Sequence, residues 1–444
     1  MNPSEKALII IPAMILIMVS CGSRPDISTY QSVLKVDTCL HDASHTYFVY
    51  IPAHSSDCET MPLVIIIDPH GSGSFAINHF IEAAETYKFI LGASNLVRNN
   101  YADYNRAIEV LAGDIKARYP AGDKTYLAGF SGGARMVLAY AQSHDINGVL
   151  ACGALAAPDQ LKSIKAYVYA LSGKADFNFP EVAHFILNET DRPSNLQLQL
   201  AGELHQWPSS EDLSQGLGWL YLNDKLSDTK CIPLKTVLKD FSEKGKNLAD
   251  SLLSSRQYIQ MKLICLNMLE IQDLPDRQYF KDHVESMIGS QALNDEISQL
   301  RKSLQFEYKV REAYYNALTS KETDWWNREM NELNSRIEAS KDMNMNFALK
   351  RIKAFLGIIC YSVTNNALRS NDLNNAGKTL EIYKMVEPRN PDMFFFFALY
   401  SLRTGNEELV SGYIRDALEN GFTDTMQIKK EFPVTFWKNI LPDN

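Results

Sequence analysis

The chain has 444 residues, enough for two or three domains, and 45% hydrophobic with 22% charged residues is the composition of a globular protein. The formal net charge is −9 and no long basic stripe is present, which argues against nucleic acid as a partner. Most of the 22 glycines lie before residue 226. This distribution predicts a turn-rich α/β region followed by an all-helical region.

The N-terminus has the pattern of an export signal. Residues 7–20, ALIIIPAMILIMVS, are uncharged and apolar, but the run is shorter than the ~20 residues that a spanning helix needs. It ends at Ser20-Cys21, which resembles the lipobox of bacterial lipoproteins. The resemblance implies that 1–20 is a signal peptide, that Cys21 is lipidated, and that the protein is exported and anchored to a bacterial membrane, facing the periplasm or the cell surface. An uncleaved anchor or a simple signal peptide is the alternative.

Residues 21–30 are polar and are predicted to be a tether, and residues 31–225 to be the α/β domain. Thr46 to Ile51 alternate like an antiparallel strand, and Pro62 to Asp68 form a continuous apolar run typical of a strand buried on both faces. Later strands and helices alternate, which predicts a mostly parallel sheet flanked by helices. Residues 95–102 between two of these elements are expected to be a solvated loop that could reach a substrate.

The segment Lys124 to Arg135, KTYLAGFSGGAR, contains the pattern Gly-x-Ser-x-Gly between a predicted strand and a predicted helix. Such a turn projects the Ser131 hydroxyl from the sheet edge, as in the nucleophile elbow of α/β-hydrolases. It also directs the backbone N–H of Gly132 toward a developing oxyanion. A glycine-rich strand-to-helix turn without catalytic function is the simpler alternative.

Two later strands end in residues that could complete a catalytic triad. AYVYAL runs into a loop with Asp176, and LQLQLAG runs into a loop with His205, which gives the chain order serine, acid, histidine. His205 would take the Ser131 proton, and Asp176 would orient the imidazole. Asp159 is a second candidate for the acid.

Two other histidines are interpreted differently. His184 lies in a predicted helix, where a packed or surface histidine is expected, and His70 precedes the elbow by a whole βαβ unit and is expected to shape its loop. That loop reads Pro69-His70-Gly71-Ser72-Gly73. We expect its backbone to supply the other half of an oxyanion hole, through the N–H of Ser72 or, as second choice, that of Gly71.

Four segments, Pro62–Gly73, Tyr126–Met136, Gly173–Asp176 and Gly202–Pro208, together resemble secreted esterases related to feruloyl esterases and polyhydroxybutyrate depolymerases. The resemblance covers about residues 40–225 and implies an α/β-hydrolase fold. It departs from the family at Phe177-Asn178-Phe179 after the acid. No insertion is long enough to form a separate cap, so we expect an open site suited to bulky or polymeric esters.

Residues 226–444 are predicted to form an all-α domain. Its clearest repeats lie at 356–422, where Asn371, Ala376, Leu380 and Tyr383 correspond to Gly405, Val410, Ile414 and Ala417, 34 residues later. This period resembles tetratricopeptide repeats, whereas a generic helical bundle is the alternative. The resemblance implies packing against the neighbouring domain or binding of a protein partner. The Phe394–Phe397 run is interpreted as core between helices, and one of Trp325 and Trp326 is expected to be exposed.

The seven cysteines show no spacing typical of a zinc site. Cys39 and Cys58 could form a disulfide in an oxidising compartment, and two free thiols are an equal alternative.

The sequence therefore predicts a serine hydrolase that cleaves carboxylic esters, on carbohydrate-linked or polymeric substrates, without metal or cofactor. The alternatives are an inactive hydrolase-fold scaffold that acts through its helical domain, or a serine peptidase.

Overall fold

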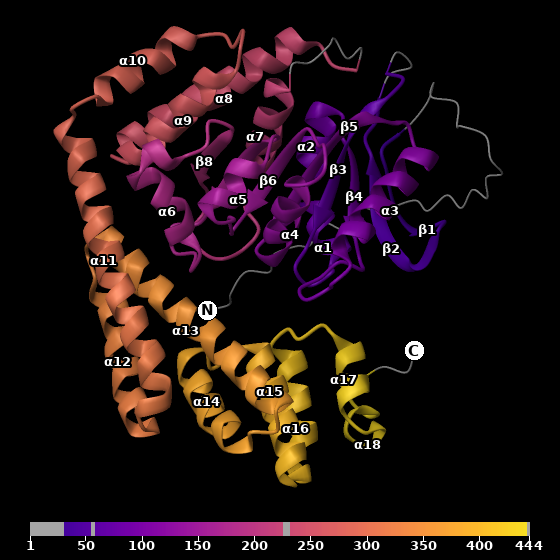
Figure 1. Cartoon of the computed structure of the whole chain (residues 1–444), viewed down its shortest axis with the longest axis vertical. Coiled ribbons are helices and arrows are strands. Elements are labelled where there is room, and N and C mark those ends of the chain that lie inside the picture. Colours follow the sequence, from indigo (N-terminus) through magenta and orange to yellow (C-terminus); the bar gives the residue numbers. More distant parts are fainter. Residues whose placement is uncertain (1–30, 55–57, 225–230, 442–444) are drawn as a thin grey trace, which may run out of the picture.

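The computed structural model of the chain describes residues 31–54, 58–224 and 231–441 (Figure 1). The predicted signal peptide, the tether and the lipidation site Cys21 lie outside the described residues, so these stay predictions. Within the described part, no helix is long and apolar enough to cross a membrane.

An eight-stranded sheet in the order β1-β2-β4-β3-β5-β6-β7-β8 forms the centre of the first half. β2 runs antiparallel to both its neighbours, and β3 to β8 are parallel to one another. This is the α/β-hydrolase topology, and the predicted fold class is confirmed. The strands are β1 (Val33–Cys39), β2 (Asp42–Ile51), β3 (Met61–Ile67), β4 (Ile90–Ser94), β5 (Ala121–Phe130), β6 (Gly148–Cys152), β7 (Tyr167–Ser172) and β8 (Leu196–Leu200).

Helices cover both faces of this sheet. Every residue of β3, β4, β6 and β8 is buried, as expected of apolar runs in a parallel sheet. Two short helices follow β3 instead of one long one, because His79 and Phe80 close the first with tight backbone turns. The helices are α1 (Gly73–Asn78), α2 (Ile81–Tyr87), α3 (Tyr104–Arg118), α4 (Gly132–Ala141), α5 (Pro158–Ser163), α6 (Phe179–Leu187), the 3-10 helix η2 (Glu189–Asp191) and α7 (Ser210–Asn223).

The second half is all-helical, as predicted, and extends along one side of the sheet before turning beneath it (Figure 1). Its helices are α8 (Leu234–Ser254), α9 (Tyr258–Glu270), α10 (Arg277–Met287), α11 (Gln291–Ser320), α12 (Thr323–Ala339), α13 (Met343–Arg369), α14 (Leu373–Val386), α15 (Pro391–Thr404), α16 (Glu407–Glu419), α17 (Thr425–Glu431) and α18 (Val434–Trp437).

The edge strand β8 is covered by α9. Side-chain amides of α9 donate to two carbonyls of β8, from Gln260 to Leu200 at 2.7 Å and from Asn267 to Leu198 at 3.0 Å. These bonds occupy carbonyls that would otherwise be open to strand addition. An unpaired sheet edge therefore depends on the helical half for its hydrogen bonds.

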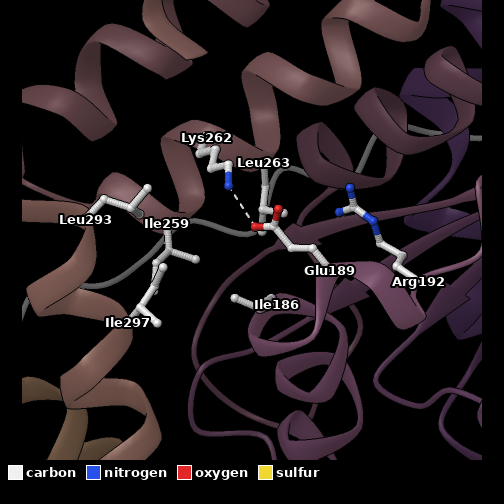
Figure 2. Close-up of a pocket in the computed structure, with 8 residues that line it drawn as sticks. All are labelled: Ile186, Glu189, Arg192, Ile259, Lys262, Leu263, Leu293 and Ile297. Carbon is white, nitrogen blue, oxygen red and sulfur yellow. Dashed lines mark hydrogen bonds and ion pairs between the residues drawn. The ribbon is translucent and has the colours of Figure 1, made fainter. Parts of the chain in front are cut away.

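The α6–α9 junction is closely packed. Lys262 on α9 forms an ion pair with Glu189 of η2 at 2.7 Å, among the apolar side chains shown in Figure 2. The cavity there has a volume of about 10 Å³, which is room for no more than one water molecule. This junction is a packing interface and does not form a ligand site.

Buried apolar residues form two cores whose division differs from the predicted boundary at 225/226. The first core extends from Cys39 to Leu304 and includes α8, α9 and the first part of α11. The second extends from Tyr314 to Leu441. The long helix α11 contributes to both, so the first helices after residue 231 pack as part of the α/β unit.

The two repeat units predicted near the C-terminus occupy equivalent places in successive helical hairpins, α13–α14 and α15–α16. Asn371 and Gly405 adopt φ angles of 59° and 79° in the turns between the paired helices, where a left-handed residue ends the first helix. The matched apolar positions are all buried: Ala376, Leu380, Tyr383, Val410, Ile414 and Ala417. That these hairpins are tetratricopeptide repeats stays a prediction.

The aromatic residues singled out in the helical half are mostly core. Phe395, Phe396 and Phe397 are buried between helices, and Phe394 is half-buried. Trp326 is fully buried and Trp325 is half-buried.

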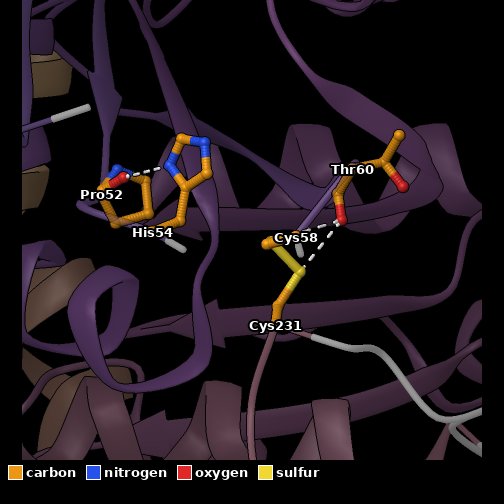
Figure 3. Close-up of a disulfide and its surroundings, with 5 residues drawn as sticks. All are labelled: Pro52, His54, Cys58, Thr60 and Cys231. Atoms are coloured by element: carbon orange, nitrogen blue, oxygen red, sulfur yellow. Dashed lines mark hydrogen bonds between the residues drawn. A yellow bond between two sulfur atoms is a disulfide. The ribbon is translucent and has the colours of Figure 1, made fainter. Parts of the chain in front are cut away.

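A disulfide joins Cys58 to Cys231, 173 residues apart (Figure 3). Cys39 is a buried free thiol, so neither of the two alternatives left open by the sequence, a Cys39–Cys58 bond or two free thiols, is what the structure has. The reason is topological: Cys39 ends the outermost strand β1, whereas Cys58 lies before the central strand β3, next to the start of the helical half. The bond fixes the beginning of that half to the α/β unit.

Candidate active site

Ser131 lies at the tip of a sharp turn between β5 and α4, as the elbow pattern predicted. Its φ of 53° and ψ of −116° are strained for a residue with a side chain, and its N–H is fixed by the Cys152 carbonyl at 2.8 Å. The turn needs small neighbours: a Cβ on Gly129 would lie 2.5 Å from the backbone of Gly133, and one on Gly133 would overlap the carbonyl oxygen of Ile67. The glycines therefore allow strand and helix to approach and expose the hydroxyl.

Three side chains from the loops after β5, β7 and β8 form a hydrogen-bonded chain. Ser131 Oγ is 2.9 Å from His205 Nε2, and His205 Nδ1 is 2.9 Å from Asp176 Oδ2. With the Nδ1 proton donated to the carboxylate, Nε2 is free to accept the serine proton. Ser131 and His205 are partly exposed, and Asp176 is buried. The structure thus brings together the three residues that the sequence selected.

The loops that carry the acid and the histidine are bonded to each other. The Ala175 N–H donates to the Glu203 carbonyl at 2.6 Å, and a Cβ on Gly173 would lie 2.5 Å from the same oxygen. The second carboxylate oxygen of Asp176 accepts the N–H of Asn178 at 2.8 Å. These contacts fix the carboxylate before any substrate binds.

Two aromatic rings hold the imidazole of His205. The ring centroids of Phe130 and Phe177 lie 4.7 and 4.2 Å from that of His205. Phe177 is one of the residues at which the sequence departs from the esterase pattern, and here it contacts the histidine directly.

The loop after β3 presents backbone N–H groups beside the elbow. The Gly71 N–H is used in a turn to the Asp68 carbonyl at 3.1 Å, whereas the Ser72 N–H makes only a long contact of 3.4 Å to Asp68 Oδ1. The N–H of Gly132, the first residue of α4, has no acceptor within its helix. The N–H groups of Ser72 and Gly132 are therefore less engaged in other hydrogen bonds than that of Gly71, and they stay the preferred candidates for oxyanion donors.

Asp68 and Trp207 form a link that the sequence did not reveal. The buried Asp68 carboxylate accepts the Trp207 indole N–H at 2.9 Å and the His70 N–H at 2.9 Å, so it ties the oxyanion loop to the histidine loop. Burial alone would raise the pKa of Asp68, but hydrogen bonds from His70 and Trp207 outweigh it and lower the pKa. Asp68 raises the pKa of His70 chiefly through their side-chain hydrogen bond.

The other candidates lie outside the hydrogen-bonded chain. Asp159 is almost fully exposed on α5 beside Lys162, and His184 faces Asp191. His70 is exposed and anchored to Asp68, in keeping with a residue that shapes its loop. The loop after β4, expected to be solvated, places the exposed Asn99 side chain directly against Gly132, beside the nucleophile.

The helical half reaches the loops at the carboxyl ends of three strands. Asp424 pairs with Arg98 after β4 at 4.0 Å, Lys350 pairs with Glu203 after β8 at 3.4 Å, and Arg351 contacts the loop after β7. No insertion within the α/β domain signals these contacts. Ser131 and His205 stay partly exposed beside them, and the open, uncapped site stays a prediction. The helices α13 to α17, which are distant in sequence, lie below the α/β unit in Figure 1.

Within residues 31–441, apart from 55–57 and 225–230, no group of three or more histidine, cysteine, aspartate or glutamate residues is arranged to hold a metal ion.

No model of a known protein family matches the chain, and no curated protein matches it. Among solved structures, LpqC, a poly(3-hydroxybutyrate) depolymerase from Bordetella parapertussis, is 16% identical over 45% of this chain and 92% of its own, with a TM-score of 0.33. Est1E from Butyrivibrio proteoclasticus is 13% identical over 44% of this chain and 98% of its own, with a TM-score of 0.35. An uncharacterised protein from Capnocytophaga ochracea is 9% identical over 90% of this chain and 98% of its own, with a TM-score of 0.34. At such identities and TM-scores these similarities carry no argument about function.

Proposed function

We propose that this protein is a serine hydrolase that cleaves carboxylic esters. The observation that carries the proposal is the chain of two 2.9 Å contacts from Ser131 Oγ through the imidazole of His205 to Asp176. The serine, held at a strained positive φ, supplies the nucleophile. The histidine supplies a general base, and the buried carboxylate orients that base.

In the first half-reaction, Ser131 Oγ attacks the ester carbonyl carbon while His205 Nε2 takes the hydroxyl proton. The N–H groups of Gly132 and Ser72 stabilise the tetrahedral oxyanion. Collapse of this intermediate breaks the bond to the alcohol, which leaves with the proton from Nε2. A water molecule then attacks the acyl-enzyme, His205 takes its proton and returns it to Ser131 Oγ, and the carboxylic acid is released.

The finer proposal is an exported enzyme acting on carbohydrate-linked or polymeric esters. The Cys58–Cys231 disulfide supports an oxidising compartment, in line with the signal sequence that ends at Cys21. The substrate class rests on the sequence resemblance alone. Turnover of short soluble esters should be compared with release of acyl groups from a polymer, and a preference confined to small acyl chains would contradict it.

A fluorophosphonate probe tests the reaction class on the full chain. We expect the wild-type protein and Ser143→Ala, which removes an exposed serine just beyond the C-terminal end of α4, to be labelled, and Ser131→Ala to remain unlabelled. Labelling that survives Ser131→Ala would identify a different nucleophile. An unlabelled wild-type protein would favour the inactive scaffold acting through its helical half. Faster cleavage of peptidyl anilides than of matched esters would favour the peptidase.

A further inference from the structure

The loop that carries Asp176 is held from outside the α/β unit by two arginines of the helical half. Arg351 on α13 donates from Nη1 to the Lys174 carbonyl at 2.5 Å, and Arg311 on α11 donates from Nη2 to the Phe177 carbonyl at 2.9 Å. These two carbonyls lie on either side of Asp176 in the sequence. Both ends of the short acid loop are thus fixed by guanidinium groups more than 130 residues away in the chain.

Glu307 on α11 joins the two arginines into one cluster. Its Oε2 accepts Arg351 Nε at 2.8 Å and Nη2 at 2.5 Å, and its Oε1 is 2.5 Å from Arg311 Nη2. Glu307 and Arg351 are fully buried and Arg311 nearly so. Arg351 therefore turns two nitrogens to the carboxylate and Nη1 to the loop, in a plane set by the carboxylate. Arg311 uses its Nη2 for both Glu307 and the Phe177 carbonyl, and its Nε is buried without a hydrogen-bond partner.

Aromatic and polar contacts add to the hold that the cluster of Arg351, Glu307 and Arg311 has on the loop. The Arg351 guanidinium lies 4.7 Å from the ring centroid of Phe179, the first residue of α6, and so spans the whole acid loop. At the start of the loop the Lys174 side chain is bonded to Gln257, in the turn between α8 and α9. The loop is consequently enclosed between the sheet and three segments of the helical half.

A buried cluster of three charges is a poor means of adding stability, because desolvation cancels most of the Coulomb gain and apolar residues of similar volume do as well. Its geometric effect is more specific. A carboxylate that is to keep an imidazole aligned for proton transfer tolerates little displacement, and a shift of about 1 Å can cost about a hundredfold in rate.

We propose that Arg351, Glu307 and Arg311 are positioning residues for the hydrolase: they fix the loop 174–177 so that Asp176 meets His205. That the cluster aligns Asp176 for catalysis rests on the proposed function, whereas that it holds the loop in place rests on the contacts alone. It implies that the helical half is part of the catalytic unit.

The test uses the full chain with the substitutions Arg351→Met, Glu307→Leu and Arg311→Met combined, so that no buried charge is left without a partner. Arg351→Met alone serves as a second variant. Arg403→Met is the matched control, since Arg403 also donates to a backbone carbonyl, that of Leu368, but within the second core.

Two readouts are needed. Hydrogen–deuterium exchange of the segment 173–179 reports the loop itself, whose amides at Ala175, Asp176, Asn178 and Phe179 are all hydrogen-bonded in the native state. We expect exchange at least about tenfold faster in the triple variant and unchanged in Arg403→Met. The rate of Ser131 labelling by the fluorophosphonate should fall about 10- to 100-fold, with KM for a soluble ester within about threefold of wild type.

A double-mutant cycle distinguishes positioning from a general structural role. In an Asp176→Asn background the triple substitution should lower the labelling rate by less than about threefold, because residues acting through one group are not additive. A full additional loss in that background, or unchanged exchange of the loop, would overturn the proposal. If the wild-type protein is not labelled at all, the esterase proposal fails, and the exchange measurement still decides whether the cluster holds the loop.

Discussion

Replacing Trp207 with phenylalanine isolates the hydrogen bond between the histidine loop and the oxyanion loop. The smaller ring keeps the contacts with Phe80 and Phe130, whose centroids each lie 5.4 Å from the indole, but the donor to Asp68 Oδ2 is lost. Because the acceptor is a buried carboxylate, we expect the free energy of unfolding to fall by about 1.5–3 kcal/mol at pH 7.

The deficit should depend on pH. The folded-state pKa of Asp68 lies below its ordinary value of 3.8, so its ionised form contributes stability that is present above that value and lost as pH falls through the folded pKa. Removing the indole donor raises the folded pKa toward the unfolded one. The wild type and Trp207→Phe should therefore differ equally at pH 7 and pH 5, and the difference should shrink below about pH 4.

Urea-induced unfolding, followed by circular dichroism at each pH, measures this difference. Trp437→Phe is the matched control, since its indole donates to a neutral carbonyl, that of Phe432, at 3.0 Å. The loss in free energy of unfolding caused by Trp437→Phe should be smaller than that caused by Trp207→Phe and should not change with pH. A Trp207→Phe difference under about 0.5 kcal/mol, or one that persists unchanged below pH 4, would refute the role assigned to the Asp68 carboxylate.

Three further results are expected. Gly133→Ala should destabilise the protein by about 1–3 kcal/mol or prevent folding, because its Cβ would overlap the carbonyl oxygen of Ile67. Gly132→Ala should fold, because its Cβ meets only the movable side chain of Asn99, and thermal unfolding compares the two variants directly. Replacing Cys58 and Cys231 by serine should lower the free energy of unfolding by about 2–5 kcal/mol in urea without reductant, and an unchanged midpoint would argue against the bond. Alkylation of the unreduced, urea-unfolded chain should modify Cys39 and leave Cys58 and Cys231 unmodified. Protection of Cys39 from alkylation would instead indicate a Cys39–Cys58 bond.

The sequence alone determined the elements whose signals are local. The strand, the glycine-rich turn and the helix around Ser131 are encoded within twelve consecutive residues, and each needs only its neighbours to form. Asp176 and His205 could be selected because parallel strands end at the same edge of a sheet, so that chain order alone predicts their meeting. The 34-residue period near the C-terminus was visible for the same reason, since it repeats a local pattern of turn and buried positions.

Only the tertiary structure decided what connects distant segments. Nothing near Cys58 in the sequence selects Cys231 as its partner, and nothing near Asp68 selects Trp207. The contact of Arg351 with the acid loop arises because α11 runs down beside the α/β unit and α13 returns below it (Figure 1). Such contacts depend on how whole elements pack, and side-chain patterns that specify a helix leave open which surface that helix will meet.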